Sequence, residues 1–241
     1  MIKKFLYKLI QQLKKIVEVF YPGYYSVNCK SIKRIVKNKN LSIENIYDIG
    51  CFKGEWYKER KRTFPSQSKY FLFDAQNLLD SKIKNKDIKF FNVVLGSKQG
   101  QIVEFWQDGG SGSSFYKELG NNLWDEVTPK EYRVFTLEHI IKQENLPCPN
   151  YLKIDTQGTE IEVLKGLNNL MNIDNLYFIE LEISLYRINK NSPLINDVIK
   201  FLEDQNYLLI SVEQLPIVEY FNERKLVQLN GIFARKDLIS N

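Results

Sequence analysis

Charged side chains interrupt two apolar runs in the second half of the chain, at positions where they could do acid–base chemistry. In YLKIDT, Lys153 and Asp155 alternate with apolar neighbours, and in LYFIELEI, Glu180 and Glu182 do the same. Because alternate residues of a strand point to one face, we expect each pair to lie on a single side of its strand. A carboxylate held there can remove the proton of a hydroxyl group. We therefore take Asp155, Lys153 and Glu182 as candidate catalytic residues.

The same acids could instead hold a divalent cation. Glu160 follows Asp155 at the start of an expected helix, so Asp155, Glu160 and Glu182 form a candidate metal-binding set. With a single histidine, His139, and no paired cysteines, oxygen ligands favour magnesium or manganese over zinc. Two structural alternatives stay open: Asp155 could cap the turn before Gly158, and Glu160 could complement the dipole of its helix.

A glycine-containing turn, IYDIGCFKG, follows the first apolar run at residues 46–54. It lacks the middle glycine of a dinucleotide-binding fingerprint, and it lacks the Gly-Lys-Ser/Thr end of a phosphate-binding loop. Its spacing, D-x-G-x-x-x-G, suits S-adenosylmethionine, whose carboxylate and amine can be bound by backbone groups at a helix start and by a nearby acid. A tight turn that only packs against the next helix is the alternative.

The second apolar run, YFLFDA, ends at Asp74, where a carboxylate could accept hydrogen bonds from both ribose hydroxyls of a cofactor. Ligands of a parallel sheet bind beyond the carboxyl ends of its strands, so this acid and the glycine turn are expected to lie together. The candidate cofactor-binding residues are Asp48, Gly50, Cys51, Phe52, Gly54, Asp74 and Ala75.

From residue 45 onward, short apolar runs alternate with segments of helical periodicity. This alternation predicts a mostly parallel α/β sheet with helices on both faces, because parallel neighbours need crossover connections. Thr159 and Glu162 are expected to form a capping box for one helix. Strands are predicted at 45–49, 70–75, 89–95, 101–106, 132–137, 151–156, 176–183, 207–212 and 229–235, and helices at 55–63, 136–145, 159–171 and 193–205.

Residues 2–20 carry apolar side chains at helical spacing, with lysines available for the opposite face, which predicts an amphipathic helix that ends near Pro22. This helix could pack on the domain, form a homodimer with a second copy of the chain, or make a peripheral membrane contact. We divide the chain into an N-terminal helical extension over 1–40 and a Rossmann-like domain over 41–241.

The composition narrows the class of protein. The 241 residues carry a net charge of only +5, with lysines and acids spread along the chain, so we expect no nucleic-acid partner. Polar residues interrupt the apolar start of the chain, which argues against a signal peptide, and no stretch is long enough to span a bilayer. The three cysteines form no paired motif, which fits a reducing compartment, and we expect a cytoplasmic protein.

Together these segments resemble the FkbM family of S-adenosylmethionine-dependent methyltransferases. The resemblance runs from about residue 46 to residue 182 and is carried by DIGCFKG, FLFDA, VVLGSKQG, SGSSFY and, most specifically, LKIDTQGTEIEVLKG. It implies a Rossmann-like class I methyltransferase fold with a seven-stranded sheet. It also implies S-adenosylmethionine as the cofactor and O-methylation of a sugar hydroxyl, in the biosynthesis of a surface polysaccharide or glycan.

Two other functions are consistent with the sequence. The acceptor could be a small metabolite, a lipid or a polyketide-type hydroxyl rather than a glycan, because the loops beyond the strand ends set that choice. The chain could also be a non-catalytic Rossmann-like module that docks through its basic N-terminal helix. The intact acids Asp48, Asp74 and Asp155 argue against a module that has lost its chemistry.

Overall fold

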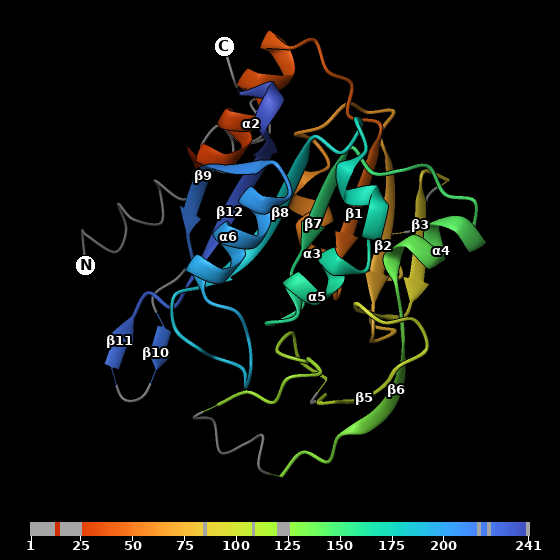
Figure 1. Cartoon of the computed structure of the whole chain (residues 1–241), viewed down its shortest axis with the longest axis vertical. Coiled ribbons are helices and arrows are strands. Elements are labelled where there is room, and N and C mark those ends of the chain that lie inside the picture. Colours follow the sequence, from red (N-terminus) through yellow and green to blue (C-terminus); the bar gives the residue numbers. More distant parts are fainter. Residues whose placement is uncertain are drawn as a thin grey trace.

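The computed structural model describes residues 13–14, 26–83, 86–107, 109–119, 126–215, 218–220 and 223–239 (Figure 1). The amphipathic helix predicted over residues 2–20 lies outside the described residues, apart from residues 13 and 14, which are helical. Its role and the division of the chain at residue 40 therefore stay predictions. No helix in the described part of the chain has the length and apolar character needed to cross a bilayer.

A seven-stranded sheet forms the centre of the molecule. In spatial order its strands are β3 (Ile88–Asn92), β2 (Lys69–Asp74), β1 (Asn45–Ile49), β7 (Tyr151–Ile154), β8 (Phe178–Ser184), β12 (Gln228–Arg235) and β9 (Tyr207–Gln214). The pairs from β3 to β8 are parallel, whereas β12 runs antiparallel to both of its neighbours. The sheet is thus mostly parallel, as predicted, with one reversed strand. The chain places β2 and β3 on one side of β1 and then crosses to β7 on the other side, which puts a switch point at the end of β1.

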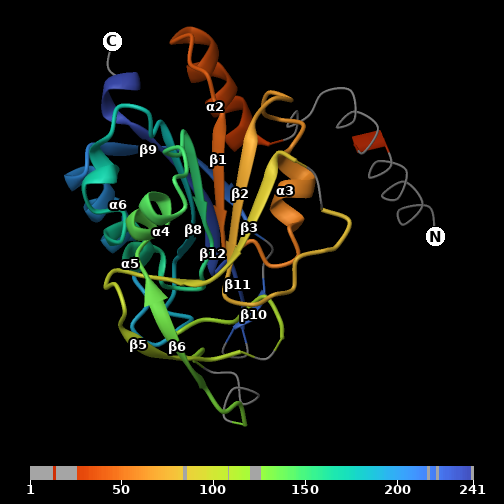
Figure 2. The ribbon, with the colours of Figure 1, turned by 90° about the vertical axis from the view of Figure 1, so that its right-hand side faces the viewer.

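Helices cover both faces of this sheet (Figure 2). On one face lie α2 (Val27–Asn38) and α3 (Glu55–Arg60), and on the other lie α4 (Leu137–Gln143), α5 (Glu160–Lys165) and α6 (Ile195–Asp204). The sequence of β1 shows how both faces are buried: Tyr47 and Ile49 pack with α4, α5 and α6, while Ile46 packs with α2 and α3. The predicted α/β class is therefore confirmed.

Helix α2 was not among the predicted helices, although it falls within residues 1–40. Ser26 caps it by accepting a hydrogen bond from the Cys29 N–H at 2.9 Å. Ile32 and Ile35 on its apolar side are buried in the same core as Ile46 of β1. Part of the segment preceding the glycine turn is thus packed onto the central sheet.

A small three-stranded sheet lies beyond the carboxyl ends of the parallel strands (Figures 1 and 2). It consists of β4 (Val94–Leu95), β6 (Lys130–Phe135) and β5 (Ile102–Phe105), and a separate hairpin is formed by β10 (Val218–Tyr220) and β11 (Glu223–Lys225). The single strand predicted over 89–95 is split into β3, which pairs with β2, and β4, which pairs with β6. The short 3-10 helices are Asn168–Asn172 and Lys236–Leu238.

Candidate functional site

The turn between β1 and α3 explains the two glycines of the first motif. Gly50 has a φ of +75°, and a Cβ there would lie 1.8 Å from the carbonyl oxygen of Asp155, so the main chains of two neighbouring strand ends meet at this point. Gly54 has a φ of +74°, and a Cβ there would lie 2.3 Å from Cδ1 of Ile83. Gly54 is therefore required by the start of α3 and by its packing, and it lines neither of the cavities described below.

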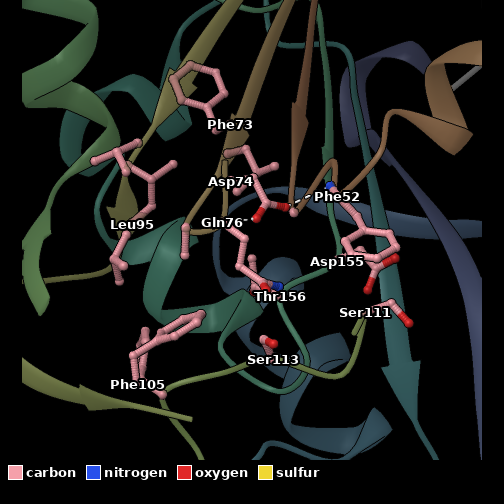
Figure 3. Close-up of a pocket in the computed structure, with 16 residues that line it drawn as sticks. Phe52, Phe73, Asp74, Gln76, Leu95, Phe105, Ser111, Ser113, Asp155 and Thr156 are labelled. Atoms are coloured by element: carbon pink, nitrogen blue, oxygen red, sulfur yellow. Dashed lines mark hydrogen bonds between the residues drawn. The ribbon is translucent and has the colours of Figure 1, made fainter. Parts of the chain in front are cut away.

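Asp74 stands at the carboxyl end of β2 and is bonded on both sides by main-chain groups (Figure 3). Its Oδ2 accepts the N–H of Phe52 and its Oδ1 accepts the N–H of Gln76, each at 2.7 Å. These bonds fix the carboxylate at the edge of a cavity, with its remaining lone pairs available to a ligand. Burial raises the pKa of Asp74, and the two N–H groups oppose that rise.

We call this hollow the Asp74 cavity; it lies between the ends of β1 and β2 and the small sheet. Of the predicted cofactor-binding residues, Gly50, Phe52, Asp74 and Ala75 line it. Other lining residues, which were not among the candidate cofactor-binding residues, are mainly apolar or small: Gln76, Val93, Val94, Leu95, Phe105, Ser111, Ser113, Phe115 and Thr156. The candidate catalytic residue Asp155 also lines this cavity. The Oε1 atom of Gln76 is buried without a hydrogen-bond partner.

Asp48 and Lys153 form a buried ion pair. They lie opposite each other on β1 and β7, and Nζ of Lys153 is 3.1 Å from Oδ1 of Asp48. Asp48 is fully buried and lines neither the Asp74 cavity nor the second cavity described below. It was expected to bind the cofactor directly, but its side chain faces Lys153 instead. Burial raises the pKa of Asp48, and Lys153 opposes that rise.

Lys153 connects this pair to the predicted catalytic acid. Its ammonium group lies 3.5 Å from Oδ2 of Asp155 and donates to the carbonyl of Gly50 at 3.3 Å. Burial alone would lower the pKa of Lys153, but Asp48 and Asp155 raise it above its usual value. Lys153 therefore stays charged and holds the two acids on either side of it.

A second hollow, which we call the acidic cavity, lies on the α3 side of β1, β7 and β8 and has a volume of about 360 Å³. The predicted catalytic residues Asp155, Lys153 and Glu182 all line it, and so does Cys51. Its remaining lining residues are Gly50, Phe52, Glu55, Trp56, Glu59, Ser111, Gln157, Glu180, Leu215 and Asn230. The acidic cavity shares Asp155 with the Asp74 cavity, so this carboxylate stands where the two meet.

Side chains hold the carboxylates of the acidic cavity in place. Gln157 donates from Nε2 to Asp155 at 2.9 Å and to Glu182 at 3.0 Å, and Gln228 also donates to Glu182. Glu180 accepts from the Tyr151 hydroxyl at 2.5 Å and from the Trp56 indole at 3.2 Å. Burial raises the pKa of Glu182 well above its ordinary value, and Asp155 and Glu160 add to the rise.

Glu160 is committed to its own turn and reaches neither cavity. Its Oε1 accepts the N–H groups of Thr156 at 2.9 Å and Gly158 at 3.1 Å, and burial raises its pKa to about 7. The predicted capping box is wrong: the side chain of Thr159 makes no cap bond, and Glu162 accepts from Ser97 and Lys165 instead.

The predicted metal set is not assembled as a cluster, because Glu160 turns toward the main chain while Asp155 and Glu182 share the amide of Gln157. Across the described ranges, no group of three or more His, Cys, Asp or Glu residues is arranged to hold a metal ion. Sequence reasoning did not assign Trp56 or Gln157 to the site. Gln157 lies inside the strongest motif and Trp56 lies two residues after the glycine turn, and these positions were the available signals.

A family model described as the methyltransferase FkbM domain matches residues 62–209. A curated protein, the hexuronic acid methyltransferase AglP of Haloferax volcanii, is 23% identical over 77 residues, which cover 30% of this chain and 32% of AglP. This chain thus matches about a third of the length of that relative.

Two solved structures align over most of the chain. The precorrin-6y C5,15-methyltransferase of Geobacter metallireducens has 12% identity and a TM-score of 0.46, over 85% of this chain and 86% of that one. The magnesium protoporphyrin IX methyltransferase of Synechocystis, with bound SAM, has 10% identity and a TM-score of 0.45, over 86% and 78%.

Proposed function

Because the chain belongs to the FkbM methyltransferase family, we propose that it is an S-adenosylmethionine-dependent O-methyltransferase that acts on a sugar hydroxyl. The observation that carries this proposal is the meeting of two cavities at Asp155, one suited to a nucleoside and the other lined by acids. A transfer enzyme needs the donor and the acceptor side by side, since alignment of the reacting groups supplies much of the rate.

The Asp74 cavity fits the adenosine half of the cofactor. The Asp74 carboxylate retains acceptor capacity for a ribose diol, and the unpartnered Oε1 of Gln76 offers a second acceptor beside it. Val94, Leu95 and Phe105 provide apolar surface for a base. We assign Gly50, Phe52, Asp74 and Ala75 to cofactor binding. When bound, S-adenosylmethionine supplies a methyl group on a positively charged sulfur.

Asp155 is the residue that we assign to receive the proton of the acceptor hydroxyl. It is partly exposed, it lines both cavities, and the neighbouring Lys153 balances its charge. Glu182 lies within reach of the same Gln157 amide and can hold a second hydroxyl of the acceptor. Asp48 acts through Lys153, which it keeps charged and in place.

A divalent cation, magnesium or manganese, on Asp155 and Glu182 is the alternative to Asp155 acting as a metal-free base. Chelation should then abolish turnover, and either ion should restore it, whereas a metal-independent base would be indifferent to both treatments. We also propose the cytoplasm as the compartment and surface polysaccharide or glycan biosynthesis as the process. A small-metabolite hydroxyl is the alternative acceptor.

Calorimetry with S-adenosylmethionine and with its demethylated product tests the cofactor assignment. The Asp74→Ala variant should bind about 2 to 4 kcal/mol more weakly, because it loses charge-assisted hydrogen bonds to the ribose. Asp204→Ala on the exposed end of α6 is the matched control and should bind normally. Transfer of a labelled methyl group to sugar acceptors tests the reaction. Unchanged affinity in Asp74→Ala would move the ribose elsewhere.

A further inference from the structure

The acidic cavity has an unbalanced charge. Five carboxylates line it, from Glu55, Glu59, Asp155, Glu180 and Glu182, and Lys153 is the one basic residue among the lining side chains of the described chain. The charge of Lys153 is already shared between Asp155 and the buried Asp48 behind it. A ligand entering this cavity therefore meets net negative charge.

The nearby cation Arg60 offsets the charge of the buried Glu180 but leaves the other acids of the cavity unbalanced. Its guanidinium pairs with Glu213 at 3.2 Å and donates to the sulfur of Cys29, and Arg60 does not line the cavity. Burial raises the pKa values of Glu180 and Glu182, so these two acids carry a proton most readily, and the negative charge that a ligand meets comes chiefly from Asp155 and from Glu55 and Glu59. An anionic ligand would add a further negative charge beside these three carboxylates.

The rim of the acidic cavity is also negatively charged. Glu55 and Glu59 lie one helical turn apart on α3 and are both exposed. Trp56, from the same helix, lines the cavity between the rim and the buried Glu180, to which its indole donates. An aromatic side chain with carboxylates around it suits a ligand that presents C–H faces, hydroxyl donors and, best of all, an ammonium group.

We propose that the acceptor site takes a sugar without negative charge, prefers an amino sugar over a neutral one, and rejects uronic acids. This inference rests on the proposed function and specifies the acceptor for the same site. It also separates this chain from its partial relative, which is named for a hexuronic acid, an anionic sugar.

The experiment compares three acceptors of one ring size: glucosamine, methyl glucoside and glucuronate. Labelled methyl transfer from S-adenosylmethionine gives kcat/KM, and calorimetry on protein loaded with the demethylated cofactor gives acceptor affinity. Glucuronate should be used at least about tenfold less well than methyl glucoside, because like charges disfavour the wrong partner. Added salt should narrow that ratio, since the rim charges are exposed. A preference for glucuronate would overturn the proposal.

The double variant Glu55→Gln/Glu59→Gln neutralises the rim without altering the buried acids. It should reduce the discrimination against glucuronate by about three- to tenfold, because it removes two like charges at the cavity mouth. Glu203→Gln/Asp204→Asn is the matched control: it changes the net charge equally, at exposed positions of α6 on the opposite face of the sheet. An equal effect in both variants would show that overall charge, not the cavity, sets the preference, and would overturn the proposal.

A measurement of cofactor binding shows whether the proposed function or only the acceptor inference has failed. A protein that does not bind S-adenosylmethionine or its product refutes the proposed function. A protein that binds the cofactor but binds glucuronate as well as methyl glucoside, or binds none of the three sugars, refutes only the acceptor inference.

Discussion

The two cavities that meet at Asp155 are built in different ways. The Asp74 cavity depends on the main chain: Gly50 packs directly on the backbone of residue 155, and two N–H groups fix Asp74. The acidic cavity depends on side chains that hold one another, through Gln157, Tyr151 and Lys153. The first should therefore be sensitive to changes of backbone shape, and the second to changes of side-chain charge and hydrogen bonding.

The largest effect is expected for Gly50→Ala. The new Cβ would lie 1.8 Å from the Asp155 carbonyl, and φ would be held at +75°, so the strand ends must separate. We expect a loss of about 3 kcal/mol or more in the free energy of unfolding, from strain and clash together, and a loss of cofactor binding. Denaturant unfolding and calorimetry measure both.

Gly100→Ala is the matched control for this change. Gly100 has a φ of +80°, but a Cβ there would meet nothing within 4 Å. Only the conformational strain, about 1 to 2 kcal/mol, should appear, and cofactor binding should be kept. Equal losses in the two variants would contradict the view that close backbone contact shapes the Asp74 cavity.

Glu160, the first residue of α5, should make stability depend on pH. Its folded pKa of about 7 lies above the ordinary 4.5, so its contribution to stability is complete below about pH 4.5 and is lost as the pH rises through 7. The loss amounts to about 3.5 kcal/mol at most, at roughly 1.4 kcal/mol per pKa unit. Other buried acids, Glu180 and Glu182 among them, have raised pKa values and act in the same direction.

Glu160→Gln isolates this contribution, since its amide oxygen can still accept the N–H groups of Thr156 and Gly158. Denaturant unfolding from about pH 5 to about pH 8 should show that the parent protein loses more stability than the variant, by up to about 3 kcal/mol. Parallel stability curves for the two proteins would mean that Glu160 does not titrate in this range.

Asp155→Asn tests whether the acidic cavity depends on the charge of Asp155. Asparagine keeps the shape and can still accept from Gln157, but it cannot take a proton or balance Lys153. Turnover should fall about 100-fold or more, while cofactor affinity and Tm stay near the parent values. Full activity in this variant would make Asp155 structural and leave the base unassigned.

The smallest effect is expected for Gln157, which has a φ of +55° and whose amide joins two carboxylates. Gln157→Gly keeps that backbone conformation at no steric cost but removes the amide, and turnover should fall about tenfold as Asp155 and Glu182 lose a shared donor. Gln157→Ala removes the same amide under strain, so it should lose stability as well. Equal activity in parent and Gln157→Gly would show that the amide does not position the acids.

The sequence predicted the parts of the molecule that local pattern determines. The apolar runs of β1, β2 and β7 and the turn after β1 lie where the pattern placed them, and parallel pairing then brought Asp74 to the glycine turn. The roles of Asp48 and Glu160 could not be predicted, because each depends on which buried group its carboxylate reaches. The Gln228–Glu182 bond joins residues 46 positions apart, and no local signal marks it.

Strand β12 has a consequence for the way the protein is made. It lies between β8 and β9 although it follows both along the chain. During synthesis on a ribosome, β9 therefore emerges before the strand that will join it to the sheet, and its edge stays unpaired until then. Asn230 and Gln228, which complete the wall and the hydrogen bonding of the acidic cavity, arrive with that strand. A nascent chain thus completes the acidic cavity only when β12 has been inserted and the sheet is closed.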